Sequence, residues 1–142
     1  MEIITIKGAS NTGKTTLLKY AYKNLLADGA DILEYDCNDF LVDDFYAYII
    51  WHGIKIVFFS MGDELEDVKN GVDKANYWKV DVLINALNNS ISENKYRNLL
   101  FEDEISINME NKSDKEDRVQ QKQRKYYEEL LPKLVGIISS SN

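Results

Sequence analysis

The chain has 142 residues, of which 44% are hydrophobic and 29% are charged. This length favours one domain with a single core, and the single proline and seven glycines argue against a linker or a low-complexity chain. The formal net charge of −7 argues against sequence-independent binding to nucleic acid or to an anionic membrane, because both need a dense cationic surface.

The cysteine content and the first residues bear on the cellular compartment. Cys37 is the only cysteine, so the chain cannot form an internal disulfide. Residues 1–7 have the pattern of a β-strand and lack that of a secretory leader. We therefore expect a cytoplasmic protein.

The first part of the chain predicts a strand, a glycine-rich loop and a helix. Residues 1–7 carry three isoleucines among polar neighbours and end at Gly8. From Lys14, apolar residues recur at helical spacing until Asp28 and Gly29 end the run.

One further strand and a hairpin are expected next. Residues 32–35 form a short apolar run that ends at Asp36. Residues 45–60, FYAYIIWHGIKIVFFS, are rich in β-branched and aromatic residues on both sides of His52 and Gly53. This pattern predicts a β-hairpin with His52 in its turn, with a helix over residues 45–51 as the alternative.

The second half of the chain alternates between helical and strand patterns. We expect a helix around residues 65–75, a strand over 80–87, a short helix near 96–100 and a strand over 104–109. A long amphipathic helix is predicted from about residue 114. Pro132 interrupts it, so the segment after Pro132 is either a continuation beyond a kink or a final strand over residues 134–138.

The alternation of strands and helices predicts an α/β fold. We expect a three-layer sandwich with a mainly parallel central sheet and one β-hairpin, formed as a single domain over residues 1–142.

Residues 8–15, GASNTGKT, match the pattern G-x-x-x-x-G-K-[ST] at every fixed position, between a predicted strand and a predicted helix. In such a loop the backbone N–H groups surround a phosphate and the helix N-terminus adds partial positive charge. The alternative is a plain strand-to-helix turn with an exposed lysine. The match resembles the Walker A motif of P-loop nucleoside triphosphatases.

The resemblance implies a bound nucleoside triphosphate, ATP, with Mg²⁺ as cofactor, and the fold of that superfamily. It implies that Lys14 contacts the β and γ phosphates and takes part in catalysis, and that the Thr15 hydroxyl is a magnesium ligand. The predicted nucleotide-binding residues are Gly8, Ala9, Ser10, Asn11, Thr12, Gly13, Lys14, Thr15 and Thr16.

Asp63 is the candidate for the second acidic position that P-loop proteins use to hold the magnesium shell. It follows the apolar run IKIVFF, but Ser60, Met61 and Gly62 intervene, so the match is partial. The alternative is that Asp63 caps the helix that follows. The run IVFFSMGD also resembles small P-loop proteins of phage and bacterial genomes.

Acidic residues near the second strand are candidates for the acceptor side of a phosphoryl transfer. Asp36 is predicted at the carboxyl end of a strand, where open α/β sheets bind ligands, and it is a candidate general base. The stretch VDDFYAY, with Asp43 and Asp44, resembles the acid-acid-aromatic-tyrosine signature of uridine-kinase-like enzymes. Solvated loop acids are the alternative. Arg118 is the candidate that clamps the transferred phosphate.

The pattern N-K-x-D at Asn111 to Asp114 is the one that GTPases use to recognise guanine. The same segment contains a capping box, Ser113-x-x-Glu116, which explains these residues without a ligand. Because no D-x-x-G element follows the third strand, we expect ATP rather than GTP.

These patterns predict a magnesium-dependent ATP-binding protein that transfers a phosphoryl group to a small molecule, as a small-molecule kinase does. Two alternatives remain: a non-catalytic nucleotide-sensing or adapter ATPase module, and a GTPase if Asn111 to Asp114 recognise guanine.

Overall fold

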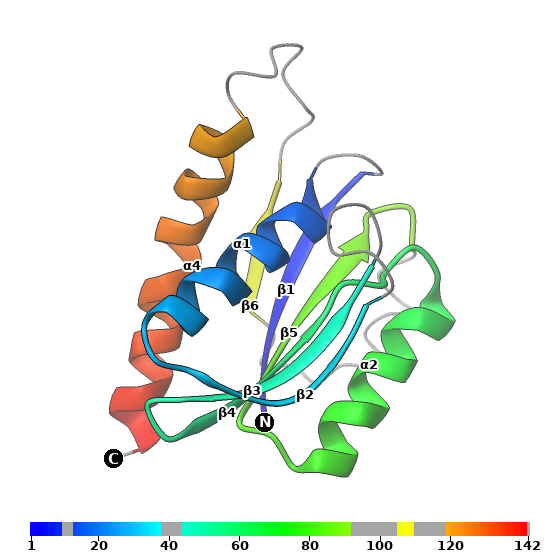
Figure 1. Ribbon diagram of the computed structural model, residues 1–142. Helices are drawn as coiled ribbons and strands as arrows, with labels where there is room; N and C mark the ends of the chain where they lie inside the picture. The colour runs from blue at the N-terminus through cyan, green and yellow to red at the C-terminus, as the bar shows by residue number, and fades with distance from the viewer. Residues whose placement is uncertain (10–12, 38–43, 92–104, 110–118, 142) are drawn as a thin grey trace.

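The computed structural model describes residues 1–9, 13–37, 44–91, 105–109 and 119–141 (Figure 1). These residues form strands and helices in an order that largely follows the sequence pattern. In chain order they are β1 (Glu2–Gly8), α1 (Lys14–Ala27), β2 (Asp31–Asp36), β3 (Tyr46–Trp51), β4 (Ile54–Phe59), α2 (Leu65–Trp78), β5 (Val82–Asn88), β6 (Ile105–Asn108) and α4 (Val119–Ser141).

The strands form one mixed sheet in the order β2-β3-β4-β5-β1-β6. β4, β5, β1 and β6 run parallel to one another, whereas β2 and β3 pair antiparallel, as do β3 and β4. The prediction of a mainly parallel sheet of the P-loop type is therefore wrong: the β2-β3-β4 part is antiparallel.

Connection length explains this difference. A parallel pair needs a crossover of a dozen or more residues, whereas antiparallel strands can be joined by a tight turn. β3 and β4 are joined only by His52 and Gly53, both at positive φ (47° and 80°), as a two-residue hairpin turn requires. The predicted hairpin is confirmed and the alternative helix over residues 45–51 is wrong. β2 ends at Asp36 and β3 begins at Tyr46, so this connection is also shorter than a parallel crossover needs, and the two strands pair antiparallel.

Helices cover both faces of the sheet. α1 and α4 lie side by side on one face, and α2 lies on the other (Figure 1). Alternate residues of β1 supply the two cores: Ile4 and Ile6 pack toward α1 and α4, whereas Ile3 packs toward α2. The parallel strands are therefore apolar on both faces, and the edge strand β2 is exposed along its whole length.

The last helix, α4, continues through Pro132 to Ser141, so the alternative strand over residues 134–138 is wrong. The short helix expected near residues 96–100 lies outside the described residues. Within the part of the chain that the structure describes, no helix is long and apolar enough to cross a membrane.

Candidate functional site

Backbone hydrogen bonds join the loops that leave the carboxyl ends of β4, β5 and β1. The Asn88 N–H donates to the carbonyl of Gly62 at 2.8 Å, and the Asn89 N–H donates to the carbonyl of Gly8 at 3.1 Å. Gly62 has no room for a side chain, because a Cβ there would lie 1.9 Å from the carbonyl oxygen of Ala86. This packing fixes the loop after β4, with Asp63, beside the start of the predicted phosphate loop.

Lys14, the first residue of α1, is buried, with 8% of its surface exposed. Its ammonium group donates to the carbonyl oxygens of Gly8 at 2.9 Å and Ala9 at 2.7 Å. Burial lowers the pKa of Lys14, and the negative charges of Asp63 and Asp44 oppose that shift. The lysine is therefore folded back over the end of β1, with two carboxylates in its electrostatic surroundings.

The neighbouring residue, Thr15, contacts an acid that is 29 positions away in the sequence. Its hydroxyl donates to Oδ1 of Asp44 at 2.9 Å. The same oxygen accepts a second hydrogen bond, 3.0 Å long, from the hydroxyl of Ser60 at the end of β4. Ser60 also accepts a hydrogen bond from the backbone N–H of Phe45 at 2.8 Å. Asp44 is thus fixed through Oδ1, whereas Oδ2 accepts no hydrogen bond among the described residues.

Asp63, the predicted magnesium-shell acid, does not cap α2. The N-cap is Glu64, which forms a capping box with Asp67, and the Glu64 N–H donates to the Asp67 carboxylate at 3.2 Å. The alternative role for Asp63 as helix cap is therefore wrong. The negative charge of the Asp63 carboxylate instead attracts the ammonium group of Lys14.

A cavity of about 490 Å³ lies beside Asp44, on the sheet face that α2 covers. It brings Asp36, the predicted general base, together with Asp44, although the two come from different sides of the segment 38–43. We call it the acidic cavity. It is lined by Asp36, Cys37, Asp44, Tyr46, Phe59, Met61, Asn70, Asp73 and Lys74.

Sequence reasoning missed Gln123 of α4. It is 3% exposed, and its Nε2 is 3.5 Å from the carbonyl oxygen of Gly13, to which it donates a long hydrogen bond. Its Oε1 is buried and has no hydrogen-bond partner within the described part of the chain. The only signal in the sequence is a glutamine at a core-facing position of a helix, between apolar neighbours in the helical repeat.

Asn85 of β5 has a similar unpaired group. Its Oδ1 accepts a hydrogen bond from the Thr5 hydroxyl at 2.8 Å, whereas its Nδ2 is buried without a partner among the described residues. Buried polar groups with no partner are rare in proteins. Both unpaired groups lie on elements that reach the predicted nucleotide site.

Of the remaining residues predicted for the site, one is described by the structure and the others are not. Thr16 is exposed on the first turn of α1. Ser10, Asn11 and Thr12 of the predicted phosphate loop lie outside the described residues, as do Arg118 and the segment from Asn111 to Asp114.

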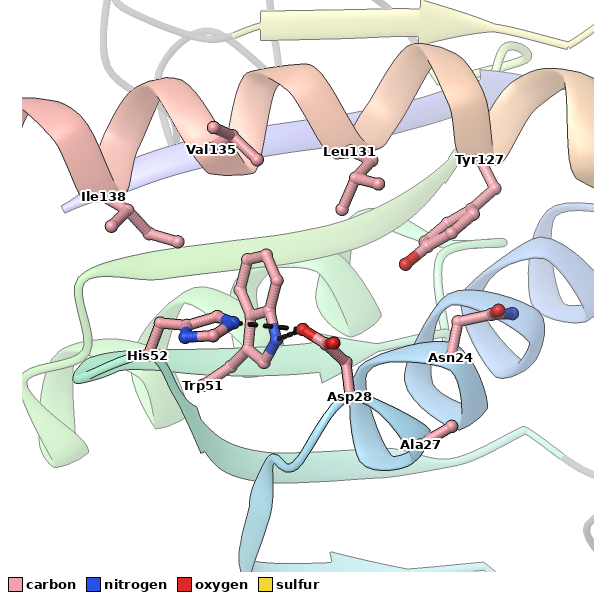
Figure 2. Close-up of a pocket in the computed structure, with 9 residues that line it drawn as sticks. All are labelled: Asn24, Ala27, Asp28, Trp51, His52, Tyr127, Leu131, Val135 and Ile138. Carbon is pink, nitrogen blue, oxygen red and sulfur yellow. Dashed lines mark hydrogen bonds and ion pairs between the residues drawn. The ribbon is translucent and has the colours of Figure 1, made fainter.

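A second cavity, of about 650 Å³, lies between the C-terminal end of α1, the β3-β4 hairpin and α4 (Figure 2). In it the Asp28 carboxylate accepts hydrogen bonds from Trp51 Nε1 and His52 Nε2, each at 3.0 Å. These two contacts tie the end of α1 to the hairpin turn. Leu131, Val135 and Ile138 of α4 form the opposite, apolar wall.

Comparison of the chain with protein-family models, with curated proteins and with solved structures finds no match. The family of the chain is therefore not assigned by similarity, and its function is argued from the arrangement of Lys14, Thr15, Asp44 and the acidic cavity.

Proposed function

We propose that the protein binds ATP with Mg²⁺ at the end of β1 and transfers the terminal phosphoryl group to a small molecule. The observation that carries the proposal is the burial of Lys14 next to the hydroxyl of Thr15, which contacts a distant acid. The buried ammonium of Lys14 lies in the electrostatic field of Asp63, and the Thr15 hydroxyl is held by Asp44. A strand-to-helix turn with an exposed lysine would need neither arrangement.

Lys14 has a clear role in this proposal. In the protein alone its ammonium is bound by the carbonyl oxygens of Gly8 and Ala9. Phosphate oxygens accept stronger, charge-assisted hydrogen bonds than carbonyl oxygens, so a bound triphosphate competes well for the same donors. Its negative charge would also raise the lowered pKa of the buried lysine.

The residues present are suitable for a magnesium ion. Mg²⁺ prefers oxygen ligands and is usually held by one or two protein groups together with phosphate oxygens and water. The Thr15 oxygen donates its hydrogen to Asp44 and keeps its lone pairs, and Asp44 Oδ2 is unpaired among the described residues. When bound, magnesium would neutralise charge on the terminal phosphates. We assign Thr15 as a ligand, and Asp44 and Asp63 as acids of the surrounding shell.

The first test is the thermal unfolding of the full chain with ATP or ADP, with and without magnesium. A ligand present at 100 times its dissociation constant stabilises the native state by about 2.7 kcal/mol. For a chain of this size the midpoint should rise by roughly 5–10 °C. A midpoint that is unchanged at millimolar nucleotide and magnesium contradicts the proposal.

The alternative function is a non-catalytic nucleotide-sensing module. The same loop and acids would support it, so turnover separates the two. The kinase releases stoichiometric ADP and phosphorylated acceptor, whereas the sensing module binds ATP without product. The acidic cavity favours the kinase, because it places a second carboxylate, that of Asp36, near the residue that contacts Thr15.

A further inference from the structure

The acidic cavity is lined by two parts of the fold that differ in chemistry. One wall comes from the sheet, where Tyr46 of β3 and Phe59 of β4 lie with their rings nearly parallel, 6.4 Å apart and at an interplanar angle of 19°. The other wall comes from the middle of α2 and is polar, with Asn70, Asp73 and Lys74. Asp44 joins the cavity to Thr15 and hence to the proposed nucleotide site.

The charged groups of the cavity are unbalanced. Among the described residues that line it, three carboxylates, of Asp36, Asp44 and Asp73, face one ammonium group, of Lys74. No hydrogen bond or ion pair within the described part of the chain engages the carboxylate of Asp36 or that of Asp73. The potential in the cavity is therefore negative, which attracts cations and hydrogen-bond donors and repels phosphate.

Lys74, the one cationic residue among the described residues that line the cavity, lies over aromatic rings. The Lys74 ammonium is 4.3 Å from the centre of the Tyr46 ring and 5.4 Å from that of Trp78. It makes no ion pair with the three carboxylates among the residues described. The Tyr46 ring face is therefore covered by a cation of the protein itself, which leaves the carboxylates as the groups that a ligand meets.

We infer that the acidic cavity binds the phosphoryl acceptor, and that this acceptor is an uncharged or cationic hydroxyl compound that carries no phosphate of its own. The inference rests on the proposed function. It also selects among acceptors: a nucleoside or an amino alcohol suits the cavity, whereas a nucleoside monophosphate would bring a dianion next to three carboxylates.

The transfer step assigns a role to Asp36. The acceptor hydroxyl oxygen uses a lone pair to bond the γ phosphorus of ATP, and the bond from that phosphorus to the bridging oxygen breaks, with its electron pair leaving on ADP. The hydroxyl proton passes to the Asp36 carboxylate, which later loses it to water. Asp36 is available for this role because no hydrogen bond engages it among the described residues, whereas Asp44 is bound through Oδ1.

The first experiment offers the full chain and Mg-ATP pairs of acceptors that differ only by a phosphate: uridine with uridine monophosphate, thymidine with thymidine monophosphate, and pyridoxine with pyridoxine phosphate. We expect transfer to the members without phosphate, with kcat/KM at least about tenfold higher. Asp73→Asn should reduce the ratio of kcat/KM between the two members of each pair. Glu66 is an exposed acid on α2 outside the cavity, so Glu66→Gln should leave that ratio unchanged.

A preference for the phosphorylated members contradicts the inference. So does transfer to neither member of any pair in samples that Mg-ATP stabilises. If Mg-ATP does not stabilise the protein at all, the proposed function fails first.

The second experiment measures the charge of the cavity without an acceptor. Cys37 lines the cavity and is the only cysteine of the chain, so its modification is specific. We compare the rates of a cationic and an anionic methanethiosulfonate of similar size, each relative to the urea-unfolded chain. The cationic reagent should react about tenfold faster, and Asp73→Asn should reduce that ratio. A ratio near one, or below it, overturns the charge argument.

Discussion

At the residue scale, the contact between Thr15 and Asp44 determines how the site is assembled. Lys14 and Thr15 were predictable, because the spacing of the glycines around them is itself the signal. The partner of Thr15 was not, since the sequence offers Asp36, Asp43, Asp44 and Asp63 as comparable acids. Only the fold brings Asp44 to within 2.9 Å of that hydroxyl. The sequence placed Asp44 on the acceptor side, whereas its contact with Thr15 leads us to propose it for the metal side.

Asp44→Asn tests this assignment. The amide oxygen can still accept the hydrogen bonds from Thr15 and Ser60, so the change removes charge more than structure. We expect ATP affinity in magnesium to fall about tenfold, and affinity without magnesium to be unchanged or slightly higher, because repulsion of the triphosphate is reduced. Asp31→Asn, on the exposed edge strand, is the matched control. Equal loss with and without magnesium contradicts the role.

Gln123→Met tests the glutamine behind the phosphate loop. The change keeps the volume and removes a buried carbonyl oxygen that has no hydrogen-bond partner among the described residues. The free energy of unfolding should therefore rise by about 1 kcal/mol, or roughly 3 °C in the midpoint. It also removes the contact with the Gly13 carbonyl, so ATP affinity should fall severalfold. Gln121→Met, exposed on the same helix, should change neither quantity. Increased stability with unchanged affinity would show that Gln123 does not position the loop.

At the element scale, local patterns predicted most of the strands and helices but not the antiparallel pairing of β2 with β3. The hairpin was predictable because His52 and Gly53 form a two-residue turn between two β-rich runs. The position of β2 was not, because its six residues pair at an exposed edge, where no burial pattern distinguishes one neighbour from another. The alternation of helices and strands along the chain therefore predicted more parallel strand pairs than the sheet contains.

Gly62→Ala tests the contact between the loop after β4 and the backbone of β5. A Cβ at residue 62 would overlap the Ala86 carbonyl, which is backbone and cannot rotate away, so we expect a loss of about 2–3 kcal/mol in the free energy of unfolding. Gly136→Ala in α4 is the control, because nothing lies within 4 Å of its Cβ position. That change should stabilise the helix by about 0.5–1 kcal/mol. Urea unfolding of both variants checks the prediction, which fails if Gly62→Ala is neutral.

Asp28→Asn tests the link between α1 and the hairpin (Figure 2). Hydrogen bonds from His52 and from Trp51 lower the pKa of Asp28 below its usual value of 3.8. Because the pKa is lower in the folded state, Asp28 contributes stability above pH 3.8, and this contribution is lost as the pH falls through its folded-state value.

The Asp28→Asn substitution should therefore destabilise the protein modestly at about pH 6, with little difference at about pH 2. Urea unfolding of the parent protein and the variant across this pH range measures the difference. A gap that is constant with pH would show that the charge of Asp28 is not involved.

At the scale of the whole molecule, the apolar residues that stabilise the fold lie apart from the polar residues of the candidate site. Large apolar residues fill both sides of the sheet: Ile4 of β1 and Leu17 of α1 lie in one core, and Val72 of α2 lies in the other. The polar groups of the candidate site lie where the parallel strands end. Composition and periodicity could predict such cores, because each depends on local spacing. The acidic cavity could not be predicted, since it is formed by residues from β2, β3, β4 and α2 together.

The measurement that tests the central claim most directly is the calorimetric titration of ATP with magnesium into Lys14→Met and Lys23→Met. Both changes remove one positive charge from α1. Lys14 is buried and donates a hydrogen bond to the carbonyl oxygen of Gly8, whereas Lys23 is exposed. Charge-assisted hydrogen bonds contribute about 1.5–3 kcal/mol, so Lys14→Met should weaken ATP binding roughly 10- to 100-fold. Lys23→Met should bind like the parent protein. Equal affinities of the two variants, or no binding by the parent protein, would contradict the account.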